Sequence, residues 1–236
     1  MKKIHLTFDI DWAPDWYIPR LLEQLDKSSI SASFFITHEA DYLKNMIKKH
    51  EIGIHPNFLK NSSHGKSLSK IINYFSFVKE ARLLRTHALF QSSPLMEKIF
   101  LHNKNLKYDL SMYAYRNKVQ MFDFISDKVC FKRILFNWSD GTALVDKNEK
   151  WNKNTFKFSD LIVVDFHPIH LILNSNSLKN YNNLKKAYSN KPLNNLSENE
   201  INKFINKDFG IKFFLKQIID EFHIISFSEL LCELES

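Results

Sequence analysis

Short apolar runs alternate with helical patterns along the chain. Strand-like runs occur at residues 3–8, 30–36, 51–55, 82–86, 107–112, 133–138, 161–166 and 223–227. Apolar residues at intervals of three and four predict helices at residues 17–27, 39–49, 67–79 and 93–103. Strands that alternate with helices indicate βαβ units and a mainly parallel sheet. We therefore predict an α/β fold, and the number of units favours a distorted (β/α) barrel with six to seven parallel strands.

The chain length is consistent with one domain. The sequence has 236 residues, of which 44% are hydrophobic and 14% aromatic. A chain of this length and composition buries one sizeable core. We predict a single domain over residues 1–236, with the Asn-rich stretch 174–206 as its largest insertion.

Neither the net charge nor the cysteines indicate a particular function. The net charge is +7 and the isoelectric point is about 9.2. The lysines are scattered and no nucleic-acid-binding motif occurs, so we expect no nucleic acid partner. Cys130 and Cys232 form no Cys-x-x-Cys metal pattern and are typical of reduced thiols.

No apolar run approaches the roughly 18 residues that a membrane helix needs. The first residues are basic, but Asp9 and Asp11 interrupt the apolar stretch that a signal peptide requires. The sequence therefore predicts a cytoplasmic protein without an integral membrane segment.

Residues with catalytic potential cluster at the carboxyl ends of the predicted strands. They are Asp9, Asp11, His55, His64, Arg85, His87, Trp138, Asp140, His167 and His170. The carboxyl ends of parallel barrel strands meet on one face, where active sites are built. Carboxylates and imidazoles with an open coordination position suit a catalytic Zn²⁺ or another divalent transition metal.

Each of these residues also has an ordinary structural interpretation. A histidine in a loop is often only exposed, and an aspartate can cap the segment that follows it. The Asp-x-Asp at Asp9 and Asp11 also occurs in glycosyltransferases and resembles the start of haloacid-dehalogenase-type phosphatases, although Ala13 departs from that pattern. Neither alternative accounts for the histidines at the other strand ends.

Five segments resemble motifs of one enzyme family. They are Leu-Thr-Phe-Asp-Ile-Asp at 6–11, Ser-Ala-Ser-Phe-Phe-Ile-Thr at 31–37, His-Glu-Ile-Gly-Ile-His-Pro-Asn at 50–57, Leu-Arg-Thr-His at 84–87 and Val-Asp-Phe-His-Pro-Ile-His at 164–170. The chain resembles polysaccharide deacetylases of the NodB-homology class, carbohydrate esterase family 4. It is most similar to the divergent branch found in O-antigen and surface-polysaccharide biosynthesis clusters. The resemblance covers residues 1 to about 175.

The resemblance implies a distorted barrel and metal-dependent removal of N-acetyl groups from sugars. It implies that Asp9 is the catalytic base, held by Arg85, and that His167 is the general acid. It further implies that Asp11 and His55 are metal ligands.

The chain departs from the family pattern in three places, one of which is the arginine motif, where the usual proline is absent and His87 stands in that region. Ile10 separates two aspartates that are usually adjacent, and Leu59 occupies the position of the usual second metal histidine. We therefore predict His64, in the following loop, as the third metal ligand.

The remaining candidate residues are predicted to lie near the bound substrate. The resemblance implies that Trp138 and Asp140 support the acid histidine, and we expect both near the substrate together with His87. His170 competes with His167 for the role of the acid and is otherwise expected to contact substrate.

The expected substrate is a small-molecule or lipid-linked N-acetylated sugar, such as a nucleotide-linked precursor of a surface polysaccharide. Two alternatives stay open: a metal-dependent hydrolase of a cyclic amide or ureide on the same fold, and a non-catalytic sugar-binding barrel. Release of acetate distinguishes the first alternative from a deacetylase, and a metal assay distinguishes the second.

Overall fold

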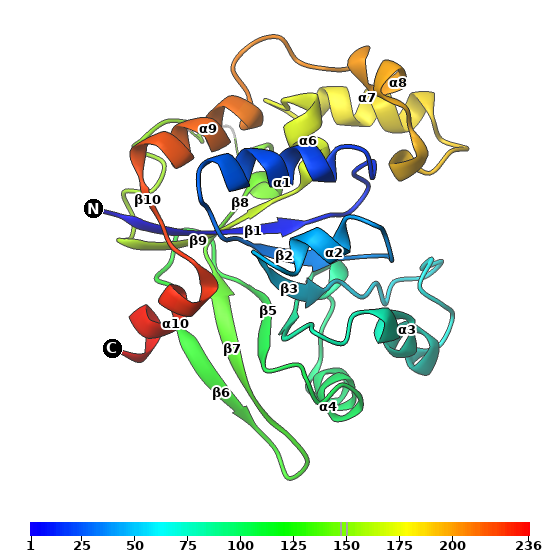
Figure 1. The fold of residues 1–236 in the computed structure, drawn as a ribbon, viewed down its shortest axis with the longest axis vertical. Coiled ribbons are helices and arrows are strands. Elements are labelled where there is room, and N and C mark those ends of the chain that lie inside the picture. The colour runs from blue at the N-terminus through cyan, green and yellow to red at the C-terminus, as the bar shows by residue number, and fades with distance from the viewer. Residues whose placement is uncertain (147, 150) are drawn as a thin grey trace.

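A curved sheet of mainly parallel strands organises the molecule (Figure 1). The computed structural model describes residues 1–146, 148–149 and 151–236. The strands of the sheet are β1 (Lys3–Asp9), β2 (Ser33–Ile36), β3 (Glu51–Ile54), β4 (Leu83–Leu84), β5 (Tyr108–Tyr113), β6 (Met121–Ile125), β7 (Cys130–Phe136), β8 (Trp138–Ser139), β9 (Leu161–Phe166) and β10 (His223–Ile224). Neighbouring strands follow the order β6-β7-β5-β4-β3-β2-β1-β9-β8.

One bent segment, β7 followed by β8, connects the β5 side of the sheet to β9. Only Asn137 separates β7, which pairs with β5, from β8, which pairs with β9. The Asn137 backbone N–H donates to the Val163 carbonyl (3.1 Å), and the Val163 N–H donates to Asn137 Oδ1 (2.9 Å). Counting β7 and β8 as one, seven parallel strands of the described chain form an incompletely closed ring. The predicted distorted barrel is confirmed.

Two strands lie outside this parallel ring. The edge strand β6 pairs antiparallel with β7, and β10 pairs with the start of β1. The predicted strand at 223–227 is therefore shorter than expected. It ends because Ser226 and Glu229 form a capping box that starts a helix at Phe227.

The helices are α1 (Ile18–Lys27), α2 (Leu43–Met46), α3 (Leu68–Tyr74), α4 (Ser93–His102), α5 (Asp140–Ala143), α6 (Pro168–Leu173), α7 (Lys179–Ala187), α8 (Glu198–Asn202), α9 (Ile211–Glu221) and α10 (Phe227–Glu235), with 3₁₀ turns at Phe75–Phe77, His87–Leu89 and Leu193–Asn195. The helices predicted at 17–27 and 93–103 are confirmed as α1 and α4. The helix predicted at 67–79 is shorter than expected, because α3 ends at Tyr74 and a 3₁₀ turn follows. The helix predicted at 39–49 is wrong in length, since α2 is one turn. The chain continues after α2 in tight turns, because it must return to pair Glu51 with Ser33.

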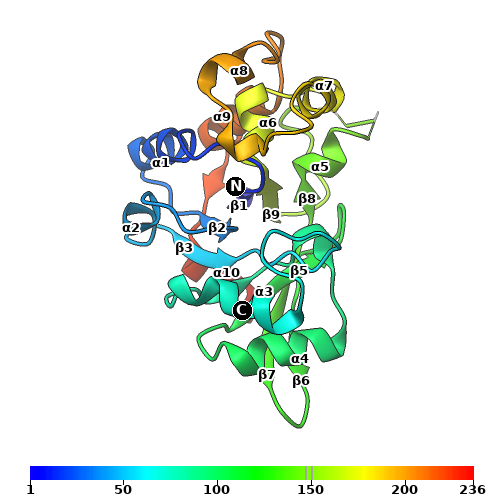
Figure 2. The ribbon, with the colours of Figure 1, turned by 90° about the vertical axis from the view of Figure 1, so that its right-hand side faces the viewer.

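Residues 174–206 form a helical layer at one end of the molecule, opposite the β6–β7 hairpin (Figure 2). Asn174 closes the base of this segment, because its Nδ2 donates to the carbonyls of Asn206 (3.1 Å) and Asp208 (2.7 Å). Leu184 and Ile201 belong to an apolar cluster shared with α6. The layer is thus fixed to the barrel by α6 and by its own base.

Apolar side chains fill both faces of the sheet. The larger cluster packs the sheet against α1, α4 and α9, and a second cluster packs it against α10. Within the described residues, no helix is long and apolar enough to cross a membrane.

Candidate active site

The carboxyl ends of β1, β3, β4 and β9 place several polar side chains at one cavity. Asp9 ends β1, His55 follows β3, Arg85 follows β4 and His167 follows β9. The side chain of Ile10 is buried in the apolar core, whereas Asp9 and Asp11 both line the cavity. Alternation of side chains along an extended chain explains this arrangement. The intervening Ile10 therefore keeps the two carboxylates on the same side.

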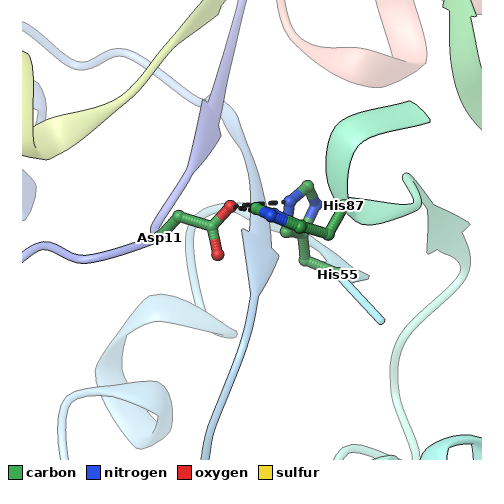
Figure 3. Close-up of side chains that lie close together, drawn as sticks. All are labelled: Asp11, His55 and His87. Atoms are coloured by element: carbon green, nitrogen blue, oxygen red, sulfur yellow. Dashed lines mark hydrogen bonds and ion pairs between the residues drawn. The ribbon is translucent and has the colours of Figure 1, made fainter. Parts of the chain in front are cut away.

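Asp11 brings two histidines together (Figure 3). Its Oδ2 lies 3.0 Å from Nε2 of His55 and 2.7 Å from Nδ1 of His87. One ligand atom from each of the three residues lies within 4.8 Å of the others. These side chains come from the end of β1, the end of β3 and the turn after β4, so three separate segments converge.

A strained turn presents His87 to this cluster. Ala88 and Leu89, which follow it, both have left-handed backbone conformations, with φ values of 53° and 54°. Such conformations cost about 1–3 kcal/mol for residues other than glycine and persist only where the surrounding structure imposes them. The His87 backbone N–H donates to the Pro56 carbonyl (3.0 Å), which ties the turn to the segment after His55.

The charges in this cluster support one another. Burial alone would raise the pKa of Asp11, but the neighbouring His55 and His87 outweigh it and hold the pKa well below its usual range. Burial likewise opposes charge on His55, yet Asp9 and Asp11 raise its pKa above the ordinary value. The cluster therefore keeps Asp11 ionised and available as a ligand.

Arg85 bridges two buried carboxylates. Its Nη1 donates to Asp9 Oδ1 (2.9 Å) and to Asp165 Oδ1 (2.7 Å), and its Nε donates to the Leu110 carbonyl (3.1 Å). The guanidinium lies between the rings of Phe35 (4.2 Å) and Phe136 (4.3 Å). Because Arg85 has no exposed surface, these contacts fix both carboxylates in place.

Gly53 on β3 allows the Phe35 ring to lie where it contacts Arg85. A Cβ at this glycine would lie 2.6 Å from the ring of Phe35 and 2.9 Å from Leu83. No larger side chain fits this position unless the neighbouring strands move. The glycine of the segment 50–57 therefore supports the arginine indirectly.

Asp140 fixes the orientation of His167. One carboxylate oxygen accepts from the His167 backbone N–H (2.7 Å), and the other lies 2.7 Å from Nδ1 of the same residue. Burial lowers the pKa of His167, but Asp140 and Asp165 outweigh it and raise the pKa well above its ordinary value. The raised pKa favours the protonated ring, and within the described part of the chain Nε2 is the nitrogen without a hydrogen-bond partner.

Among the described residues, two groups of side chains have the spacing of metal ligands: Asp11, His55 and His87, and a second group of Asp9, Asp165 and His167. In the second group both carboxylates already bind Arg85, whose positive charge repels a cation. Its histidine is bound to Asp140. The first group offers one carboxylate and two imidazoles without a competing cation, the donor set of many catalytic zinc sites. Its residues fit a divalent metal.

The ligand cluster and the Arg85 cluster share one cavity of about 310 Å³. Asp9, Asp11, His55, His87 and His167 all line it. The arrangement places a proton acceptor, a proton donor and a metal-binding group around one small volume. Such a set can perform metal-assisted hydrolysis.

A family model decides the relationship. The model of the WbmS-like polysaccharide deacetylases matches residues 6–185. The chain belongs to this family. No curated protein sequence matches the chain.

Solved structures share the fold of this family member. A Bordetella bronchiseptica protein described as a polysaccharide deacetylase involved in O-antigen biosynthesis is 24% identical, with a TM-score of 0.77 over 92% of this chain and 89% of that chain. Peptidoglycan deacetylase PdaC from Bacillus subtilis is 15% identical, with a TM-score of 0.50. This match covers 99% of the present chain and 91% of the PdaC chain. A 4-α-glucanotransferase from Thermococcus litoralis is 11% identical, with a TM-score of 0.55. This match covers 99% of the present chain and 38% of the glucanotransferase chain.

His64, predicted as the third metal ligand, lies outside the Asp11 cluster. Its Nδ1 accepts from the Asn57 backbone N–H (3.0 Å), and its ring stacks on Tyr74 at 4.7 Å. Burial, followed by the nearby His55, lowers the pKa of His64 to about 4. The structure instead brings His87, predicted to contact substrate, to the third position beside Asp11.

Two predicted substrate contacts are corrected by burial. Trp138 has no exposed surface and packs against Phe156 and Phe166 in the core, so it does not reach the cavity. His170 lies 3.3 Å from Ser175 Oγ and packs on Tyr181. Burial lowers its pKa to about 4, which leaves it neutral and unsuited to act as an acid near neutral pH.

Asp140 is also fully buried. Its carboxylate contacts His167 rather than the cavity, which agrees with the supporting role that the resemblance implies and excludes direct substrate contact. Its position therefore orients the ring of His167.

Sequence reasoning missed Asp165. This residue lies inside the apolar run of β9, where its neighbours are core residues. The one signal in the sequence is its position two residues before His167. Asp165 lines the cavity, contacts Arg85 and lies 3.3 Å from Ser139 Oγ. Burial and the adjacent Asp9 raise its pKa to about 7, against the effect of Arg85.

Asp165→Asn is expected to change how stability depends on pH. Between about pH 4 and 7 the folded protein keeps a proton on Asp165 that the unfolded chain has released. The free energy of unfolding therefore falls as pH rises through this window, by about 1.4 kcal/mol per unit of pKa difference. Asp165→Asn removes this component.

Urea unfolding of wild type and variant at pH 4.5 and 7.5 measures the difference. Asp127→Asn, at an exposed position in the turn between β6 and β7, serves as the control. Equal pH dependence in wild type and Asp165→Asn would contradict the assignment.

Proposed function

We propose that the protein is a metal-dependent hydrolase that removes an N-acetyl group from a sugar precursor in surface polysaccharide biosynthesis. One observation carries the proposal. A carboxylate–imidazole–imidazole cluster shares a cavity with a carboxylate held by arginine and a histidine held by aspartate. The family supports deacetylation, and the Bordetella bronchiseptica protein of the same fold supports O-antigen biosynthesis as the context.

Asp11, His55 and His87 would hold the metal. A bound divalent ion such as Zn²⁺ supplies Lewis acidity, which activates water and polarises the acetyl carbonyl. This ligand set replaces His64 of the sequence-based prediction with His87, because His87 Nδ1 lies beside the oxygen that also contacts His55.

Asp9 accepts the proton of the attacking water. Arg85 binds one oxygen of this carboxylate and leaves the other 3.7 Å from His55 Nδ1, so Asp9 lies next to the ligand cluster without being part of it.

His167 donates a proton to the departing amine nitrogen. An amine leaves an amide only when protonated, so the acid must be charged before the C–N bond breaks. Asp140 and Asp165 keep the proton on His167 by raising its pKa, and the bonds from Asp140 orient the ring.

The proposal keeps two further sequence-based expectations: one catalytic domain over residues 1–236 and a cytoplasmic location. A nucleotide-linked or lipid-linked sugar is the proposed substrate form. Cell fractionation tests the location.

Removal of metal is expected to stop acetate release from N-acetylated sugars. A chelator followed by desalting should lower the rate more than about 100-fold, because metal catalysis supplies several kcal/mol of transition-state stabilisation. Zn²⁺ or another divalent transition metal should restore the rate, measured by an enzyme-coupled acetate assay. Full activity in the chelated protein, or hydrolysis of a cyclic amide without acetate release, would overturn the proposal.

A further inference from the structure

Trp12 stands at the junction of two cavities. Its side chain lines the cavity of about 310 Å³ described above and a second cavity of about 240 Å³, which His64 and Asn194 also line. It is 43% exposed, and its backbone adopts a left-handed conformation with φ of 55°. The residue therefore keeps a large aromatic surface in solvent in a conformation that bulky side chains avoid.

The Trp12 ring lies directly beside the metal-ligand cluster. It forms an edge-to-face pair with the His87 ring, with centroids 5.3 Å apart and planes at 85°. A sugar ring whose acetamido group reaches Asp11 and His87 would therefore lie near the indole. Aromatic rings pack well on the apolar C–H face of a sugar, so this position suits part of a glycan substrate.

The insertion adds a cation at the same place. Lys185 Nζ of α7 lies 5.8 Å from the centroid of Trp12 and 5.2 Å from that of Tyr181. Cation–π contacts of this kind position an ammonium without neutralising it. In the described part of the chain no carboxylate forms an ion pair with Lys185, whereas Lys191 of the same insertion is paired with Glu200.

We propose that Trp12 and Lys185, with the buried Tyr181 ring positioning the lysine, form a subsite for a phosphate group attached to the N-acetylated sugar. The ammonium binds the phosphate as a point charge, and the exposed Trp12 ring covers the adjoining part of the substrate. Nucleotide-linked and lipid-linked sugars share this sugar phosphate, so the subsite serves either source. The inference rests on the proposed function, because it assigns a binding site to the phosphate group of the same N-acetylated sugar.

Binding of two small probes tests the subsite. N-acetylglucosamine 1-phosphate carries the phosphate, and methyl N-acetylglucosaminide is its neutral counterpart. Calorimetry should show tighter binding of the phosphate probe to the wild-type, metal-loaded protein. Lys185→Gln should weaken the phosphate probe about tenfold, as expected for loss of one charge-assisted contact, and leave the neutral probe unchanged.

Lys186→Gln is the matched control, because Lys186 is the adjacent exposed lysine of α7 and has neither aromatic contact. Its affinity for both probes should equal that of wild type. No preference of wild type for the phosphate probe, or equal loss in the two lysine variants, would overturn the subsite.

Two larger ligands distinguish the sources. A uridine diphosphate sugar and a lipid diphosphate sugar in detergent micelles are compared in wild type and Lys185→Gln. Dependence on Lys185 with either ligand supports the subsite and identifies the source, and dependence with neither overturns it. These measurements follow binding alone, so absence of acetate release would reject the proposed function without deciding the subsite.

Discussion

Asp9→Asn is expected to lower kcat by about 10²- to 10⁴-fold, the usual contribution of a positioned acid or base. The amide side chain keeps the size of the carboxylate and can still accept a hydrogen bond from Arg85 Nη1. It cannot take a proton from water. The metal content should be unchanged, because Asp11, His55 and His87 contact one another without Asp9.

Three measurements separate this outcome from a loss of folding. They are steady-state rates of acetate release, zinc content by elemental analysis, and the thermal midpoint. Asp165 still pairs with Arg85 in the variant, so the midpoint should fall only modestly. Asp220→Asn, at an exposed position on α9, is the control and should match wild type. Wild-type turnover in Asp9→Asn would remove Asp9 as the base.

His87→Ala is expected to weaken zinc binding at least about 100-fold, whereas His64→Ala should change it by no more than a few-fold. Loss of residues that only orient metal ligands already weakens binding by about 10- to 100-fold, and His87 offers a ligand atom itself. His64 instead accepts from a backbone N–H and stacks on Tyr74. Its removal should affect stability, by about 0.5–1.5 kcal/mol for the lost ring pair.

Competition with a chromogenic chelator measures zinc affinity in both variants, and urea unfolding measures stability. The two alanine variants act as controls for each other, because both remove a largely buried imidazole near Asp11. Retained zinc in His87→Ala together with lost zinc in His64→Ala would restore the ligand set predicted from the sequence.

The predictions that succeeded depend on local pattern. Apolar periodicity located most strands and helices, since burial of one face imposes that periodicity on each element. The paired aspartates at positions 9 and 11 were recognisable from their place after the first strand. Their joint orientation follows from the two-residue repeat of an extended chain.

The predictions that failed depend on packing between distant segments. Trp138 was expected at the substrate because it follows a strand, but the bend at Asn137 turns it into the core. Asp165 was overlooked because its neighbours in β9 are apolar. Its significance arises only from Arg85, which lies 80 positions earlier in the chain.

The sequence by itself determined the α/β class, the family resemblance and the set of polar residues delivered to the strand ends, because each depends on residue type and near-neighbour spacing. The tertiary structure decided which histidine lies beside Asp11 and His55. Positions 64 and 87 are both compatible with the spacing, and only the left-handed turn after His87 and the Tyr74 stack on His64 separate them. It also decided that α7, far along the chain, reaches Trp12. Distances across a barrel depend on how the strands close, and no local pattern encodes them.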